Sequence, residues 1–156
     1  MVLINFAATD SLELLCQLPD CRFLTVKTVL DEITYENLRN SVSRLIEEGI
    51  LEVVVTGVSP DEEIAFIEKY FRKPVGEAVA LLAAQSREAT IATDEKKARR
   101  IAKELHIKVT GTIGLLKRMI SAEIINDKQA LDLIKEMEEK ASYWPPKNYQ
   151  NYLQRS

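Results

Sequence analysis

The sequence predicts an α/β fold with three layers, α/β/α, in which helices cover both faces of a central parallel sheet of four to five strands. Strand-like and helical segments alternate along most of the chain, which is typical of such sheets. Residues 50–56 are almost all apolar and β-branched, as in a strand buried on both faces. With 156 residues and 46% hydrophobic content, we expect one domain with a real core.

The strand-like segments are short and apolar. The first, residues 2–7, is compatible with a strand or a buried helix, because periodicity alone does not separate the two. Clearer strands are expected where β-branched and other apolar residues follow turn or charged residues. These are residues 22–26, 50–56, 89–92 and 107–110.

The helical segments show apolar residues at a spacing of three to four, with start and stop signals at their ends. Pro60 and the acids that follow it begin one helix, and Gly49 ends another. Pro145 and Pro146 break the last long helix before a final turn. The remaining helices are expected near residues 12–16, 29–33, 38–46 and 113–120, with three further helices beginning at Glu77, directly after Asp94 and directly after Asp127.

Composition excludes several classes of protein. The formal net charge of −3 argues against a broad electrostatic footprint for nucleic acid, although a local basic face is compatible with it. The apolar segments are too short to span a membrane and no signal peptide is recognisable, so we expect a cytoplasmic protein. Cys16 and Cys21 are more typical of buried thiols than of a disulfide or a zinc site.

Three acids occupy corresponding places in this pattern. Glu32 follows the second strand-like segment, Glu77 lies at a helix start and Asp94 follows the strand at residues 89–92. Because ligands of open parallel sheets bind beyond the carboxyl ends of the strands, we expect these side chains near one edge. Clustered carboxylates repel each other unless a cation compensates them, and Mg²⁺ or Mn²⁺ fits oxygen ligands best. For Asp94 alone, the simpler alternative is a helix N-cap.

The sequence lacks the motifs of several other kinds of catalytic site. It has no glycine-rich phosphate loop, no Gly-x-Ser-x-Gly motif and no cysteine pairs with zinc-site spacing. His106 is the only histidine and is most simply a surface residue near the end of its helix. By elimination, metal-assisted hydrolysis of a phosphodiester is the chemistry that the acids favour.

Five stretches in this order resemble the PIN-domain nucleases, and the similarity covers nearly the whole chain. They are residues 2–6, residues 22–33, the Gly-Glu-Ala helix start at residues 76–78, the stretch at residues 92–100 that contains Asp94, and residues 109–112. The resemblance implies a single PIN-like domain over residues 1–156 and metal-dependent cleavage of single-stranded RNA in an acidic pocket that binds Mg²⁺ or Mn²⁺. It also implies a homodimer and, as in many toxin-type relatives, an antitoxin partner.

Carried over position by position, Glu32, Glu77 and Asp94 match three acidic positions of the family, and Glu95 matches a frequent second acid. In the family, a strand ending in an aspartate precedes the segment that residues 2–6 resemble, and the present sequence begins after that point. Three explanations stay open. The chain is truncated or starts too late, which we favour; or residues 1–6 replace the strand and Asp10 replaces the acid; or the fold is intact without catalysis.

A basic helix begins beside the expected pocket. Its cations Lys96, Lys97, Arg99 and Arg100 are candidates for positioning RNA phosphates, although such a run is more often a solvated face and Arg99 has the spacing to pair with Glu95. Near the C-terminus, four aromatic residues are able to stack bases, but we expect them to close the core or a dimer surface. They are Tyr143, Trp144, Tyr149 and Tyr152.

Two functions from different classes follow. The first is a metal-dependent endoribonuclease in which Glu32, Glu77 and Asp94 bind the metal. The alternative is a catalytically inactive PIN-like module that binds RNA or protein, because losing one ligand from a carboxylate cluster weakens metal binding. A signalling receiver domain is a weaker alternative, since the acid pair after the first strand and the lysine after the last are not found.

Overall fold

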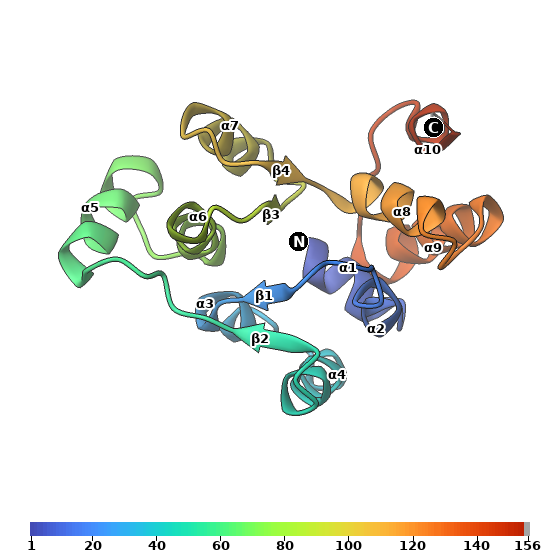
Figure 1. The fold of residues 1–156 in the computed structure, drawn as a ribbon, viewed down its shortest axis with the longest axis horizontal. Helices are drawn as coiled ribbons and strands as arrows, with labels where there is room; N and C mark the ends of the chain where they lie inside the picture. Colours follow the sequence, from blue (N-terminus) through green and yellow to red (C-terminus); the bar gives the residue numbers. More distant parts are fainter. Residues whose placement is uncertain (155–156) are drawn as a thin grey trace. The chain divides into compact units, whose positions relative to one another are not determined.

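A computed structural model describes residues 1–154 and divides the chain into two compact units. One unit contains residues 23–110, and the other combines residues 1–22 with the chain from residue 111 onward. Figure 1 labels the helices and strands of both. Each unit is described separately below.

The unit of residues 23–110 alternates strands and helices, as the sequence predicts. All four strand-like segments from residue 22 to residue 110 contain a strand, each shorter than expected. In chain order the elements are β1 (Phe23–Thr25), α3 (Lys27–Asp31), α4 (Glu36–Glu47), β2 (Leu51–Val53), α5 (Pro60–Tyr70), α6 (Gly76–Arg87), β3 (Ile91–Ala92), α7 (Lys96–Glu104) and β4 (Val109–Thr110).

The strands form two separate parallel pairs. β1 pairs with β2, with Leu24 opposite Glu52, and β3 pairs with β4, with Ile91 opposite Val109. The parallel direction is as predicted, but the single sheet of four to five strands is not found, because no strand among residues 1–154 joins β1 to β3 (Figure 1). Residues 2–7, for which the sequence left strand and buried helix open, form a helix.

Helix α6 holds this unit together. It packs against α3, α5, α7 and β3, so it contacts elements next to both strand pairs. Ala78 and Leu81 on α6 are fully buried, and so is Ala98 on α7. Small side chains let neighbouring backbones approach closely, so the core around α6 is close-packed without a continuous sheet. Ile67, Phe71, Ile91, Ile101 and Ile107 complete this core.

Helix ends in this unit follow their sequence signals. Ser59 and Glu62 form a capping box at the start of α5, with Pro60 at its first position. Gly49 follows α4 with a φ of 74°, in the left-handed region that favours glycine. Helix α3 begins at Lys27, two residues before the expected start at residue 29, and its N-cap is Val26.

The second unit is entirely helical over its described residues. Helix α1 packs on α2 and α9, and α8 packs on α2, α9 and α10. The bounds are α1 (Val2–Ala8), α2 (Leu12–Leu15), α8 (Thr112–Ser121), α9 (Asp127–Ala141) and α10 (Tyr149–Gln154). Phe6, Leu116, Met119, Ile134 and Met137 are fully buried and form its centre. The segment that sequence left between strand and helix is therefore a buried helix.

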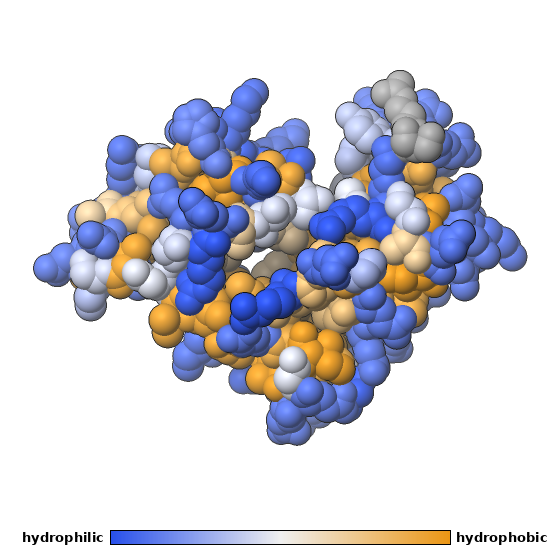
Figure 2. Space-filling view, in the orientation of Figure 1, coloured by the Kyte–Doolittle hydropathy of each residue, from blue (hydrophilic) through white to orange (hydrophobic). Residues whose placement is uncertain are grey.

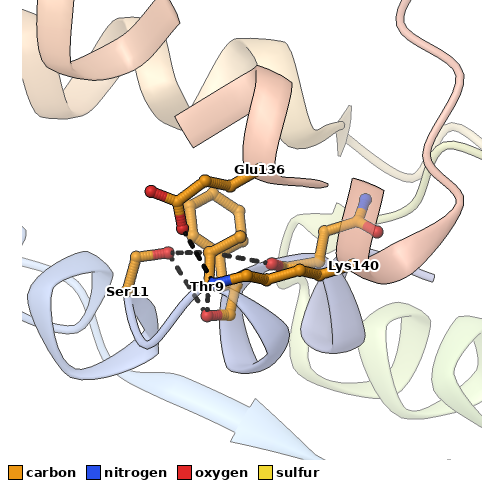
Figure 3. A network of polar contacts seen from close by, with 6 residues as sticks. Thr9, Ser11, Glu136 and Lys140 are labelled. Atoms are coloured by element: carbon orange, nitrogen blue, oxygen red, sulfur yellow. Dashed lines mark hydrogen bonds and ion pairs between the residues drawn. The ribbon is translucent and has the colours of Figure 1, made fainter. Parts of the chain in front are cut away.

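Buried hydroxyl groups end α1. The Thr9 hydroxyl lies 3.0 Å from the carbonyl oxygen of Asn5 and 2.7 Å from the Ser11 hydroxyl, which donates to the carbonyl oxygen of Phe6 (Figure 3). Beside them, Lys140 pairs with Glu136 on α9 at 3.4 Å. These bonds satisfy carbonyl groups that the end of α1 leaves without helical partners. The Ser11 hydroxyl therefore bonds to the preceding helix α1 and makes no capping hydrogen bond at the start of α2, although Ser11 is the N-cap residue of that helix.

Two further expectations concern the cysteines and the membrane. Cys16 and Cys21 are free thiols that are both partly buried. Burial and, secondarily, the Glu13 carboxylate raise the pKa of Cys16 to about 11, whereas the Sγ of Cys21 accepts a hydrogen bond from Arg118 at 3.1 Å. Every helix within residues 1–154 is too short or too polar to cross a bilayer.

Candidate acidic site

Glu32 meets the first turn of α6. Its Oε1 accepts a hydrogen bond from the backbone N–H of Gly76 at 2.6 Å, across 44 residues of sequence. The N-cap residue of α6, Val75, has no side chain that can cap the helix, so a carboxylate from the end of α3 takes this role. A Cβ on Gly76 would lie 2.8 Å from Oε2 of Glu32 and 2.9 Å from Val29, so only glycine allows this approach.

Glu77 is the next residue of α6 and is half-buried. Burial raises the pKa of its carboxyl group, a hydrogen bond from the Thr93 hydroxyl lowers it, and the carboxylates of Glu95 and Glu32 raise it again. The net direction is upwards. Two of the other acids that the sequence selected, Glu95 and Glu32, are therefore close enough to Glu77 to influence its carboxyl group.

Thr93 connects these acids, and sequence reasoning missed it. It is fully buried directly after β3, and its backbone N–H donates to Thr110 at 2.9 Å. Its Oγ1 accepts from the backbone N–H of Glu95 at 3.2 Å while its hydroxyl hydrogen is directed to Glu77. The position of Thr93 between an apolar strand and two acids could have indicated this role, because a buried hydroxyl group needs a hydrogen-bond partner.

Asp94 and Glu95 form the turn between β3 and α7. Asp94 is half-buried and Glu95 is exposed. The N-cap residue of α7 is Glu95, whose side chain makes no capping hydrogen bond, so the N-cap alternative for Asp94 is wrong by one position. Asp94 lies at the carboxyl end of β3, where the sequence placed it.

The basic residues of α7 have varied surroundings. Arg99 donates from Nη1 to the carbonyl oxygen of Thr93 at 2.8 Å, so it braces the turn and does not form the pair with Glu95 that its spacing suggested. Lys97 lies 4.8 Å from the centre of the Phe71 ring, and Arg100 lies 4.0 Å from Glu104. These side chains and Lys96 are exposed, and Figure 2 shows a largely hydrophilic surface along α7.

The carboxylate oxygens of these acids suit a hard cation, but among residues 1–154 they do not form a complete set of protein ligands. Within residues 1–154, no group of three or more His, Cys, Asp or Glu side chains is placed to hold a metal ion. Glu32 is turned towards Gly76, which takes one of its oxygens away from any cluster. Mg²⁺ is usually held by one or two carboxylates, waters and substrate phosphates, so the acids around Thr93 fit this weaker mode of binding.

Asp10, the suggested substitute acid, lies in the other unit. It is exposed in the turn after α1, with a φ of 52°. Residues 2–8 before it are helical, so the explanation in which residues 1–6 serve as the family's first strand is wrong. His106 is an exposed residue just after α7, as expected.

Comparison with known families decides the broader assignment. The profile of the family DUF3368, described as a PIN domain, matches residues 1–156. The chain belongs to the PIN domain family. No curated protein and no solved structure matches it.

Membership gives the acidic site its chemical context. The PIN domain has an α/β fold and suggests a nuclease-type function with divalent metal dependence and RNA as the ligand. The strand pairs and the surrounding helices of residues 23–110 are the α/β part of this PIN domain chain. Its acids lie where the carboxyl end of β3 meets the start of α6, an edge that suits ligand binding in α/β folds.

Proposed function

We propose that this PIN domain chain is a metal-dependent endoribonuclease that cleaves single-stranded RNA. The observation that carries the proposal is the half-buried Glu77 carboxyl group, which Thr93 orients and whose pKa is raised by burial and by neighbouring acids. Perturbed carboxyl groups of this kind are frequent at functional sites. The basic helix α7 begins three residues after Thr93.

In this proposal, Asp94 and Glu77 would hold the cation and Glu95 would contribute from the same turn as Asp94. Glu32, at the end of α3, fixes the first turn of α6 by its bond to the Gly76 N–H. A bound Mg²⁺ or Mn²⁺ would polarise the phosphodiester and supply a reactive water. Thr93 keeps the Glu77 carboxyl group in place, and Lys96, Lys97 and Arg100 attract the RNA backbone. Arg99 stabilises the turn by its bond to the Thr93 carbonyl oxygen.

The test is cleavage of an end-labelled, unstructured RNA with Mg²⁺, with Mn²⁺ and with EDTA. We expect cleavage with either metal, none with EDTA, and loss of at least about 100-fold in rate for Asp94→Asn and Glu77→Gln, the scale on which catalytic metal-site groups act. Asp132→Asn changes an exposed acid on α9 and should leave the rate unchanged. Metal-independent cleavage, or full activity of Asp94→Asn, would contradict the proposal.

The alternative is a catalytically inactive PIN-like module that binds RNA or protein. It is favoured by the lack of a three-acid group within residues 1–154. It predicts RNA binding without cleavage at any Mg²⁺ or Mn²⁺ concentration. A toxin role with an antitoxin, and a homodimer, belong to the proposal only through the family resemblance and stay predictions.

A further inference from the structure

The chain has one tryptophan, and it is almost fully exposed. The Trp144 side chain is 89% exposed, although tryptophan is usually buried to a large extent. The sequence led us to expect that the aromatic residues near the C-terminus close the core or a dimer surface. That expectation holds for Tyr143, which is 8% exposed, but Trp144 contributes nothing to the core.

The backbone on either side of this exposed ring is held in place. Residues 143–154, here called the aromatic segment, are anchored at one end by buried Tyr143 and at the other by buried Leu153. The backbone N–H of Tyr143 donates to Met137 at the end of α9, and that of Tyr149 donates to Pro146. Pro145 and Pro146 restrict the backbone directly after Trp144, so the backbone would lose little conformational entropy when a ligand covers the ring.

The chemistry of the aromatic segment favours nucleic-acid bases over a protein. It has no acidic residue, Lys147 is its only charged residue, and Tyr152 is a second exposed ring at 58%. Four amide side chains lie in the same segment and can pair with base edges: Asn148, Gln150, Asn151 and Gln154. Stable dimer interfaces are more apolar than this.

A second source of positive charge lies on the neighbouring helix. The segment ends in α10, which packs against α8, and α8 carries Lys117 and Arg118 in its second half. Arg118 is exposed and its guanidinium also touches Cys21. Proteins bind single strands by combining exposed aromatic rings, which stack on bases, with cations, which follow the phosphates. Lys147 supplies a cation within the aromatic segment itself, three residues after Trp144.

We propose that the aromatic segment is a binding surface for single-stranded RNA, on which an unpaired base stacks on Trp144. The inference rests on the proposed function in taking RNA as the ligand. It requires neither the metal nor cleavage.

Because Trp144 is the only tryptophan, its fluorescence reports directly on this contact. The experiment titrates Asp94→Asn protein in EDTA with a short oligouridylate, so that binding is measured without cleavage. We expect saturable quenching by the oligouridylate and none by an abasic oligonucleotide of the same length. Unchanged emission at RNA concentrations that saturate binding, measured by anisotropy of labelled RNA, would overturn the proposal.

Affinity provides the second measurement. In the anisotropy assay, Trp144→Ala should weaken RNA binding by about 5- to 150-fold, which corresponds to the stacking of one base, and Trp144→Phe should weaken it less. Tyr35→Ala removes an exposed ring from the other unit and should leave the affinity unchanged. Since Trp144 is exposed, these variants should fold normally, which circular dichroism checks.

Two results would overturn the inference in different ways. Equal affinity of Trp144→Ala and the unsubstituted chain would show that the base does not stack there. Self-association that disappears in Trp144→Ala, measured by sedimentation, would show that a second copy covers the ring. The proposed function fails separately, if RNA binds and quenches Trp144 but is not cleaved with Mg²⁺ or Mn²⁺.

Discussion

Replacing Gly76 by alanine tests whether the acidic site depends on one close backbone approach. The added Cβ would lie 2.8 Å from Oε2 of Glu32 and 2.9 Å from Cγ2 of Val29. Both distances are shorter than side-chain carbon atoms tolerate, so the Glu32 carboxylate must move away and Val29, which is buried, must shift. The hydrogen bond from the Gly76 N–H to Glu32 is then lost.

The size of the effect follows from two opposing terms. Losing a hydrogen bond to a charged group costs about 1.5–3 kcal/mol, and alanine regains at most about 1 kcal/mol of helix propensity over glycine. With the full regain, the net destabilisation is about 0.5–2 kcal/mol. For a chain of this length it lowers Tm by roughly 1–8 °C.

Thermal unfolding followed by circular dichroism at 222 nm is the suitable measurement, because the exposed Trp144 reports poorly on the core. A double-mutant cycle with Glu32→Ala isolates the contact. If the Gly76 and Glu32 substitutions remove the same interaction, the double variant should be less destabilised than the sum of the single variants by about 1 kcal/mol or more. Strict additivity, or unchanged stability of Gly76→Ala, would refute the capping role of Glu32.

Three other predictions concern stability. Glu77→Gln should raise Tm at pH 8 but not at pH 4. A carboxyl group whose pKa is raised on folding loses its stabilising contribution as the pH rises through the folded pKa, so its removal helps only where it is ionised; equal gains in Tm at both pH values would contradict the raised pKa. Thr93→Val should lower the free energy of unfolding by about 1–3 kcal/mol, measured with urea, because Glu77 and the N–H of Glu95 both lose a hydrogen-bond partner. An unchanged free energy of unfolding would mean that the hydroxyl group is not needed. Phe6→Ala should cost about 3–5 kcal/mol in the same assay because the ring is fully buried, whereas Tyr35→Ala should change stability by less than about 0.5 kcal/mol.

Local patterns were sufficient for most elements of residues 23–110. The strands beginning at Phe23 and Leu51 lie within the segments that β-branched residues predicted, and the capping box at Ser59 starts α5 at the expected proline. These features depend on neighbours in sequence, where side-chain shape and hydrogen-bonding capacity act directly. Parallel pairing was also predictable, because each strand is separated from its partner by a helical crossover.

The first segment was not predictable from its composition. Residues 2–7 are apolar and partly β-branched, which suits a strand or a buried helix equally. The helix is favoured by its packing, since Phe6 is fully buried and α1 packs on α9, and by the hydroxyl groups of Thr9 and Ser11, which satisfy its last carbonyl groups. The hydroxyl bonds are local, but the packing of α1 on α9 joins residues more than a hundred positions apart, and no local pattern encodes it.

By itself, the sequence determined the PIN domain family, the parallel direction of the strands and the candidate acids Glu32, Glu77, Asp94 and Glu95. That the strands form two separate pairs was decided by the tertiary structure. Only the tertiary structure decided what these acids contact: Glu32 caps α6, Thr93 orients Glu77, and Arg99 braces the turn instead of pairing with Glu95. It also decided that Trp144 lies in solvent. The physical reason is that residue type fixes what a side chain can bind, whereas burial and the available partners depend on how distant segments pack.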